Sequence, residues 1–99
     1  MRRFLVQTTS ETKSSHRGRL DIIADILASA AGGVRKTSIM YKCNLSFKQL
    51  EMYLRFLLKK DLLKMFVKSE SATSHFFETT ERGADFLRAY RNLDALMSV

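Results

Sequence analysis

Hydrophobic and basic positions alternate with helical spacing over residues 46–60. At about 100° per residue, one face of this segment collects apolar side chains: Phe47, Leu50, Leu54, Leu57 and Leu58. The opposite face collects Lys48, Met52, Arg55 and Lys59. Ser46 followed three residues later by Gln49 is a capping box, in which each side chain bonds a backbone N–H of the first turn. We therefore predict a helix over 46–60 with one face on a core and a basic face exposed.

A first helix is predicted from about Arg19 to Ala31. Its apolar residues recur at helical spacing: Leu20, Ile23, Ile26, Leu27 and Ala30. Asp21 lies in the first turn, where a negative charge complements the helix dipole, and Gly32-Gly33 is a typical C-terminal stop. This helix is expected to contribute mainly to the core.

A second, short helix is predicted from a cap at Thr37 through Lys42. Cys43-Asn44-Leu45 then forms a turn, in which Asn44 is the residue best suited to a left-handed backbone. A short helix, a tight turn and a longer basic helix together make a helix-turn-helix. In such a motif the first helix braces the second, whose exposed face is narrow enough to enter a DNA major groove.

The hydrophobic period changes to that of a strand after residue 61. Leu63, Met65 and Val67 alternate with Lys64, Phe66 and Lys68, a polar loop covers 69–74, and a second β-rich run covers 75–79. We predict a β-hairpin wing. Lys64 and Lys68 would flank DNA phosphates, although lysines on a hairpin edge also protect against aggregation.

A last helix is predicted from Thr80-Glu81 to the end of the chain. Its apolar residues step by four, three and four, as in the seam of a coiled coil: Phe86, Tyr90, Leu93 and Met97. One interpretation is that this stripe packs on the domain's own core. The other, which we favour, is that its distal half pairs with a second copy of the chain. The predicted organisation is an arm (1–18), a winged helix-turn-helix domain (19–80) and a dimerisation helix (81–99).

The charge distribution further predicts a polyanionic partner. The 99 residues suffice for one domain, and their formal net charge is +7 with a pI of about 9.9. Residues 35–60 contain seven basic residues against a single acid, Glu51. A focused basic surface gains long-range attraction and counterion release on meeting nucleic acid.

The first 18 residues lack helical or strand periodicity. Their basic residues, together with the one that follows, could track a phosphate backbone or enter a minor groove: Arg2, Arg3, Lys13, Arg17 and Arg19. Plain disorder is the alternative for this arm, and residues 4–6 could instead add a short strand.

Several classes are disfavoured by the residues available for chemistry. Cys43 is the only cysteine, so an intrachain disulfide and a Cys-rich zinc site are excluded, and a reducing cytoplasmic setting fits. The two histidines, His16 and His75, lie far from Cys43 along the chain and lack carboxylates at metal-ligand spacing. No stretch approaches the length of a membrane span. We expect no enzyme, no metal and no cofactor, and Cys43 as a small packed residue.

The combined pattern resembles the small archaeal winged-helix transcription regulators, including chromatin-associated dimeric members. The matching stretches are 19–27, 36–42 with 44–50, and 77–83. The resemblance implies a mainly α fold with a small β-hairpin that binds duplex DNA as a homodimer. It assigns base reading to Lys48, Gln49, Met52 and Arg55, and backbone contact to Lys36, Lys42, Lys59 and the wing. The full set of DNA-binding candidates is Lys36, Thr37, Lys42, Ser46, Lys48, Gln49, Met52, Arg55, Lys59, Lys64 and Lys68.

Two functional hypotheses follow. In the first, the chain is a dimeric transcription regulator in which Arg55 or Lys48 bonds guanine and Gln49 addresses adenine. In the second, it is a protein-interaction module whose basic face meets an acidic partner, with Met52 and Phe56 as apolar anchors. Affinity for duplex DNA at moderate salt separates the two.

Overall fold

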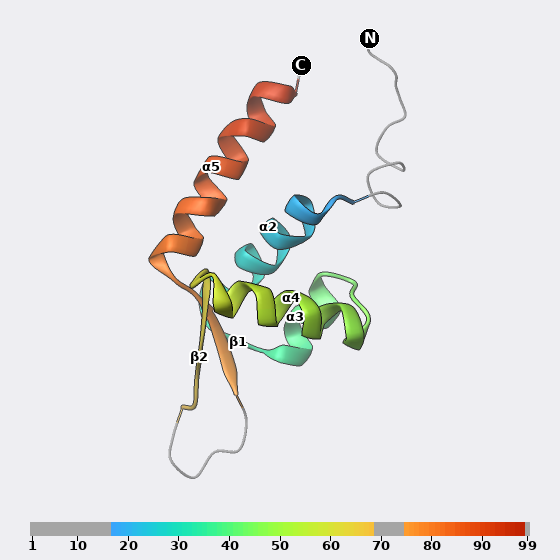
Figure 1. Ribbon diagram of the computed structural model, residues 1–99, viewed down its shortest axis with the longest axis vertical. Helices are drawn as coiled ribbons and strands as arrows, with labels where there is room; N and C mark the ends of the chain where they lie inside the picture. The colour runs from blue at the N-terminus through green and yellow to red at the C-terminus, as the bar shows by residue number, and fades with distance from the viewer. Residues whose placement is uncertain (1–16, 69–74, 99) are drawn as a thin grey trace.

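The computed structural model describes residues 17–68 and 75–98 as a mainly α fold with a small sheet. The elements are α2 (Arg19–Ser29), β1 (Val34–Arg35), α3 (Lys36–Lys42), α4 (Phe47–Lys59), β2 (Leu63–Phe66), β3 (Phe76–Thr79) and α5 (Glu81–Met97). Figure 1 shows α2, α3 and α4 gathered in the middle, with the β2–β3 hairpin projecting at one end and α5 at the other. The predicted fold class is therefore confirmed. The arm residues 1–16, including Arg2, Arg3 and Lys13, and the loop 69–74 lie outside the described residues.

The helix-turn-helix forms as predicted around α4. The Ser46 hydroxyl accepts a hydrogen bond from Gln49 N at 3.1 Å, and the Gln49 side chain accepts one from Ser46 N at 3.0 Å. Asn44 adopts the left-handed conformation with φ 55°. The predicted cap at Thr37 is wrong, because α3 begins at Lys36 directly after β1, and its N-cap, Arg35, makes no side-chain cap bond.

The core lies among α2, α3, α4 and the base of the sheet. Its fully buried side chains are Ile26, Leu27, Ile39, Leu50, Leu57, Leu63 and Cys43. Two residues expected on core faces are exposed instead, Leu20 at 53% and Phe47 at 62%. Both lie in the first turn of their helices. A helical wheel assigns a residue to a face but does not show where along the helix axis the core ends.

The wing belongs to a sheet of three antiparallel strands in the order β1-β3-β2. Phe77 is the centre of this sheet, since it pairs with Val34 of β1 and with Met65 of β2. Strands β2 and β3 were predicted, but β1 was not, because two residues are too few to show a period.

Thr79 joins the wing to α2. Its hydroxyl donates a hydrogen bond to the Leu27 carbonyl at 2.6 Å, and its backbone N–H donates one to the Ala30 carbonyl at 3.1 Å. The end of β3 is therefore held against the C-terminal turn of α2, which fixes the position of the hairpin relative to the helix-turn-helix.

The last helix has a packed half and a projecting half. Thr80 caps α5 by accepting a hydrogen bond from Gly83 N at 3.0 Å, and Phe86 packs against the core. The Tyr90 hydroxyl donates a hydrogen bond to the Asp21 carboxylate of α2. Beyond Tyr90 the apolar side chains are exposed: Leu93 at 55%, Leu96 at 81% and Met97 at 75%.

Candidate nucleic-acid interface

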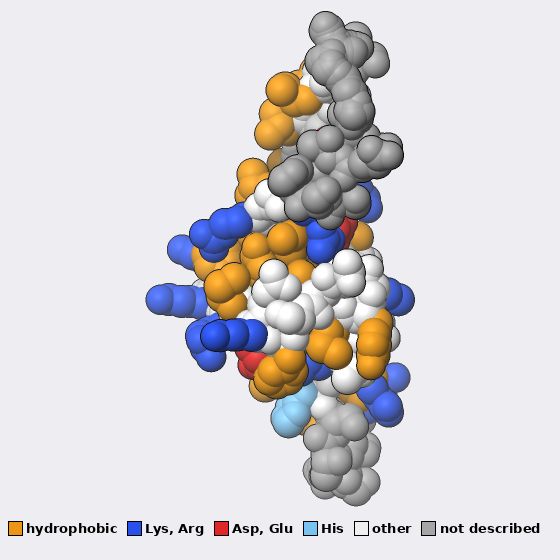
Figure 2. All heavy atoms as spheres, turned by 90° about the vertical axis from the view of Figure 1, so that its right-hand side faces the viewer, with side chains coloured by type: hydrophobic (Ala, Val, Ile, Leu, Met, Phe, Trp, Pro, Cys, Tyr) orange, Lys and Arg blue, Asp and Glu red, His pale blue; other side chains and the backbone are white. Residues whose placement is uncertain are grey.

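The outer face of α4 presents Lys48, Met52, Arg55 and Lys59, all exposed as the helical pattern predicts. In the part of the chain that the structure describes, the three cations make no hydrogen bond or ion pair with another residue. Figure 2 shows Lys and Arg side chains projecting together from one side of the middle of the molecule, with hydrophobic side chains exposed among them. The free cations of α4 are available to an external anion.

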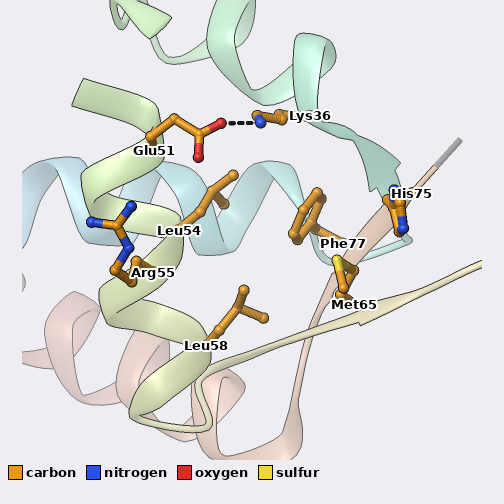
Figure 3. A pocket seen from close by; sticks show the side chains of 8 residues that line it. All are labelled: Lys36, Glu51, Leu54, Arg55, Leu58, Met65, His75 and Phe77. Carbon is orange, nitrogen blue, oxygen red and sulfur yellow. Dashed lines mark ion pairs between the residues drawn. The ribbon is translucent and has the colours of Figure 1, made fainter. Parts of the chain in front are cut away.

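Arg55 lies at the rim of a hollow between α4 and the sheet. This hollow of about 410 Å³ is lined by Lys36, Glu51, Leu54, Arg55, Leu58, Met65, His75 and Phe77. Figure 3 shows Leu54 and Leu58 directed from α4 toward the sheet, whereas the Arg55 guanidinium points away from them. The apolar side of α4 therefore braces the helix while its arginine stays at the surface.

Gln49 and Ser46 have a structural role before any DNA contact. Both side chains are exposed, but each is engaged in the capping box of α4. The bond from Ser46 N occupies one acceptor position of the Gln49 amide oxygen. An amide held this way has a defined orientation, with its NH₂ group still free to donate.

Lys36, a predicted backbone contact, is already engaged within the chain. Its ammonium forms an ion pair with Glu51 of α4 and lies 4.8 Å from the centroid of the Phe47 ring. This pair joins the start of α3 to α4. Thr37 and Lys42, also on α3, are exposed.

The two wing lysines contact the sheet yet remain accessible. Lys64 pairs with Glu78 across the β2–β3 ladder at 3.6 Å, and Lys68 lies 4.8 Å from the centroid of the Phe76 ring. Such exposed pairs contribute at most about 1 kcal/mol, so a phosphate can replace them at little cost.

Arg17 differs from the arm role suggested by the sequence. Its guanidinium donates hydrogen bonds to Asp25 and to the Cys43 carbonyl, both at 2.7 Å. It therefore joins α2 to the turn of the helix-turn-helix and is not a free cation of a basic arm. Sequence alone could not show this, because Asp25 and Cys43 lie 8 and 26 residues away.

Phe56, expected beside Met52 as an anchor for a protein partner, has contacts within the chain. It is half-buried and packs against the core, with Arg19 and Lys60 each 5.9 Å from its ring centroid. Met52, by contrast, is half-exposed on the outer face of α4. The apolar anchor of the interaction-module hypothesis therefore combines an exposed residue, Met52, with a half-buried one, Phe56.

Cys43 is a packed residue, as expected. Its side chain is buried, and this burial raises the pKa of the thiol. The Ser29 hydroxyl lies 3.5 Å from its sulfur. A thiol that stays protonated is a poor nucleophile, which disfavours a redox role.

Two exposed aromatic residues near α4 were missed as surface features. Tyr41 on α3 is 79% exposed, and Phe47 is 62% exposed at the first position of α4. The only sequence signal for Phe47 was its position directly after the N-cap, where a helix extends beyond its core.

No group of His, Cys, Asp and Glu that could hold a metal occurs within 17–68 and 75–98, and no helix of this part is long and apolar enough to cross a membrane.

A braced helix-turn-helix followed by an antiparallel hairpin defines the winged helix-turn-helix architecture. The family model for winged helix-turn-helix proteins matches residues 16–98, so the chain belongs to this family. No curated protein sequence matches the chain.

Solved structures agree with this fold. A DNA-binding protein of Sulfolobus solfataricus, Sso10a-2, superposes with a TM-score of 0.72 at 21% identity, over 82% of both chains. MepR, a transcription regulator of a multidrug efflux pump of Staphylococcus aureus, gives 0.67 at 15% identity, over 88% of this chain and 64% of MepR. The MepR–DNA complex gives 0.66 at 14% identity, over 88% of this chain and 73% of that one.

Proposed function

We propose that this protein is a homodimeric, non-enzymatic transcription regulator that binds double-stranded DNA through α4. The observation that carries the proposal is the outer face of α4, where Lys48, Arg55 and Lys59 are exposed and unpaired among the described residues. Two solved structures of similar fold support the proposal. Sso10a-2 is described as a DNA-binding protein, and MepR has been solved with DNA.

In this proposal α4 enters the major groove and the hairpin lies along the flanking backbone. The Arg55 guanidinium suits the two acceptors of a guanine, and Lys48 can reach either a guanine or a phosphate. One good bidentate pair discriminates against a wrong base by roughly 1–3 kcal/mol. Lys64 and Lys68 of the wing, and Lys42 of α3, neutralise phosphates, which adds affinity without sequence preference.

The dimer is proposed to form through the distal half of α5. Leu93 and Met97 lie on one stripe of this helix, and both are exposed. Two chains paired there would present two copies of α4. In helix-turn-helix dimers the reading helices lie about 34 Å apart, one turn of DNA, so we expect a roughly palindromic site.

Light scattering coupled to size exclusion tests the dimer independently of DNA. Leu93→Glu places a charge in the proposed seam and should give a monomer. Ala95→Glu introduces the same charge about 160° away around the helix and should stay dimeric. A monomeric wild type, or equal behaviour of the two variants, would contradict this interface.

Fluorescence anisotropy tests the DNA partner. Purified protein is titrated against a random duplex and a pool of genomic fragments from low to moderate salt. We expect affinity to fall steeply with salt, because several phosphates release counterions on binding. Binding to one fragment should persist at higher salt. Equal binding to every fragment would instead identify an architectural protein.

A protein-interaction module is the second candidate, favoured by the exposure of Tyr41 and Met52 on the helix-turn-helix. Exposed aromatic and methionine side chains are enriched at the centres of protein interfaces. The same titration separates the two functions, since an interaction module has little affinity for any duplex even at low salt.

A further inference from the structure

Phe47 is an exposed residue of α4 to which the proposed function assigns no contact. It occupies the first position of α4, and 62% of its surface is exposed. Covering an aromatic ring with an apolar partner is favourable in proportion to the area removed from water. A ring left open at the end of a DNA-reading helix is therefore suited to an apolar group on the DNA.

The position of this ring is defined before DNA arrives. The Lys36 ammonium lies 4.8 Å from the ring centroid and is itself paired with Glu51. A cation near the ring face is attracted by the aromatic quadrupole. Lys36 thus connects the ring to α4 one turn further on, which restricts the directions the ring can take.

Phe47 also belongs to the same row of side chains as Arg55. Phe47, Glu51 and Arg55 follow one another at four-residue spacing along α4. Residues four apart are neighbours on one side of a helix. Eight residues of α-helix span about 12 Å, so the ring and the guanidinium meet different base pairs of one site.

Resting on the proposed function, we propose that Phe47 is a specificity-determining residue that reads thymine through its C5-methyl group. The N-terminal residues of a recognition helix are those that contact base edges in the major groove. Thymine is the one DNA base that presents a methyl group there, and apolar side chains including Phe contact it. Phe47 supplies the apolar surface, and the polar residues of α4 supply the hydrogen bonds.

Substitution of single thymines by deoxyuridine tests this readout, because it removes the methyl group and leaves base pairing unchanged. Each thymine of the best-bound duplex is replaced in turn, and affinity is measured by competition anisotropy for wild type, Phe47→Ala and Tyr41→Ala. We expect one position at which the wild type loses about fourfold in affinity, the value for burying one methyl group. Phe47→Ala should bind more weakly and be insensitive at that position, while Tyr41→Ala, which removes another exposed aromatic ring, should keep the wild-type sensitivity.

The outcomes are distinguishable from failure of DNA binding itself. A wild type that binds a preferred duplex but is insensitive to every deoxyuridine overturns the role of Phe47 and leaves the DNA-binding function intact. If Phe47→Ala loses as much affinity as the wild type at the deoxyuridine position, the role of Phe47 is overturned as well. A wild type that binds no duplex, or binds all duplexes equally, overturns both the readout and the sequence-specific function. Circular dichroism checks that the variants fold. Phe47→Gln provides a second variant, with a polar side chain, that should also be insensitive at that position.

Discussion

Gly83→Ala is the substitution whose effect on stability the structure defines most closely. Gly83 is buried in the first turn of α5, close to the segment that joins α4 to β2. A Cβ added there would lie 2.2 Å from the Leu62 carbonyl oxygen and 2.7 Å from a methyl carbon of Thr79. The first distance is more than about 1 Å shorter than the optimum for non-bonded heavy atoms, and its partner is backbone that cannot rotate away.

Relief of this clash requires α5 to move away from Leu62. That movement breaks the hydrogen bond from Thr80 N to the Leu62 carbonyl, now 3.1 Å long. Overpacking costs roughly 1–3 kcal/mol, and loss of the bond costs about 1 kcal/mol. Alanine regains about 1 kcal/mol through its higher helix propensity. We therefore expect a net loss near 2 kcal/mol, or about 8–16 °C in melting temperature for a domain of this size.

The assay is urea denaturation followed by circular dichroism at one fixed protein concentration. Gly32→Ala is the matched control, since an added Cβ there meets nothing within 4 Å and its backbone is not left-handed. We expect the control to match the wild type or to be slightly more stable. A Gly83→Ala protein as stable as the wild type would refute the close approach of α5 to Leu62.

Three further predictions concern single side chains. Thr79→Val removes the hydroxyl that bonds the Leu27 carbonyl and should lower the free energy of unfolding by about 1–2 kcal/mol in the same assay. The hydrogen bond to Asp21 raises the pKa of Tyr90 to about 12, so the folded protein keeps this proton to higher pH than the unfolded chain. That contribution to stability is complete below about pH 10 and is lost as the pH rises through 12, so the stability difference between wild type and Tyr90→Phe should shrink over this window. Burial raises the pKa of Cys43, so iodoacetamide should label it slowly in native protein and rapidly in urea; equal rates would contradict its packing.

The elements that follow local rules could be predicted from sequence. The start of α4 depends on the Ser46–Gln49 capping box, and the turn before it depends on the left-handed backbone of Asn44. These features involve residues at most three apart, so they can be predicted from the local sequence. The burial of Leu50, Leu54 and Leu57 follows from helical period alone.

The features that sequence reasoning missed depend on contacts between distant segments. β1 exists because Val34 meets Phe77, and the wing is fixed because Thr79 bonds the end of α2. Arg17 is held by Asp25 and the Cys43 carbonyl, which only the folded chain brings together. The candidate site was found as a face of α4, but the sequence could not show that Lys36 of α3, a predicted backbone contact, is already paired with Glu51.

The central claim is that the outer face of α4 binds duplex DNA, and Arg55→Ala tests it most directly. Its matched control is Arg88→Ala, which removes the same charge from α5, where Arg88 pairs with Asp85 one turn away. Affinity for the preferred duplex is measured by anisotropy at one moderate salt concentration. We expect Arg55→Ala to bind roughly tenfold more weakly, equivalent to about 1.4 kcal/mol, and Arg88→Ala to stay within about twofold of the wild type. Equal losses in the two variants, or none in either, would contradict the assignment of α4 as the DNA-reading helix.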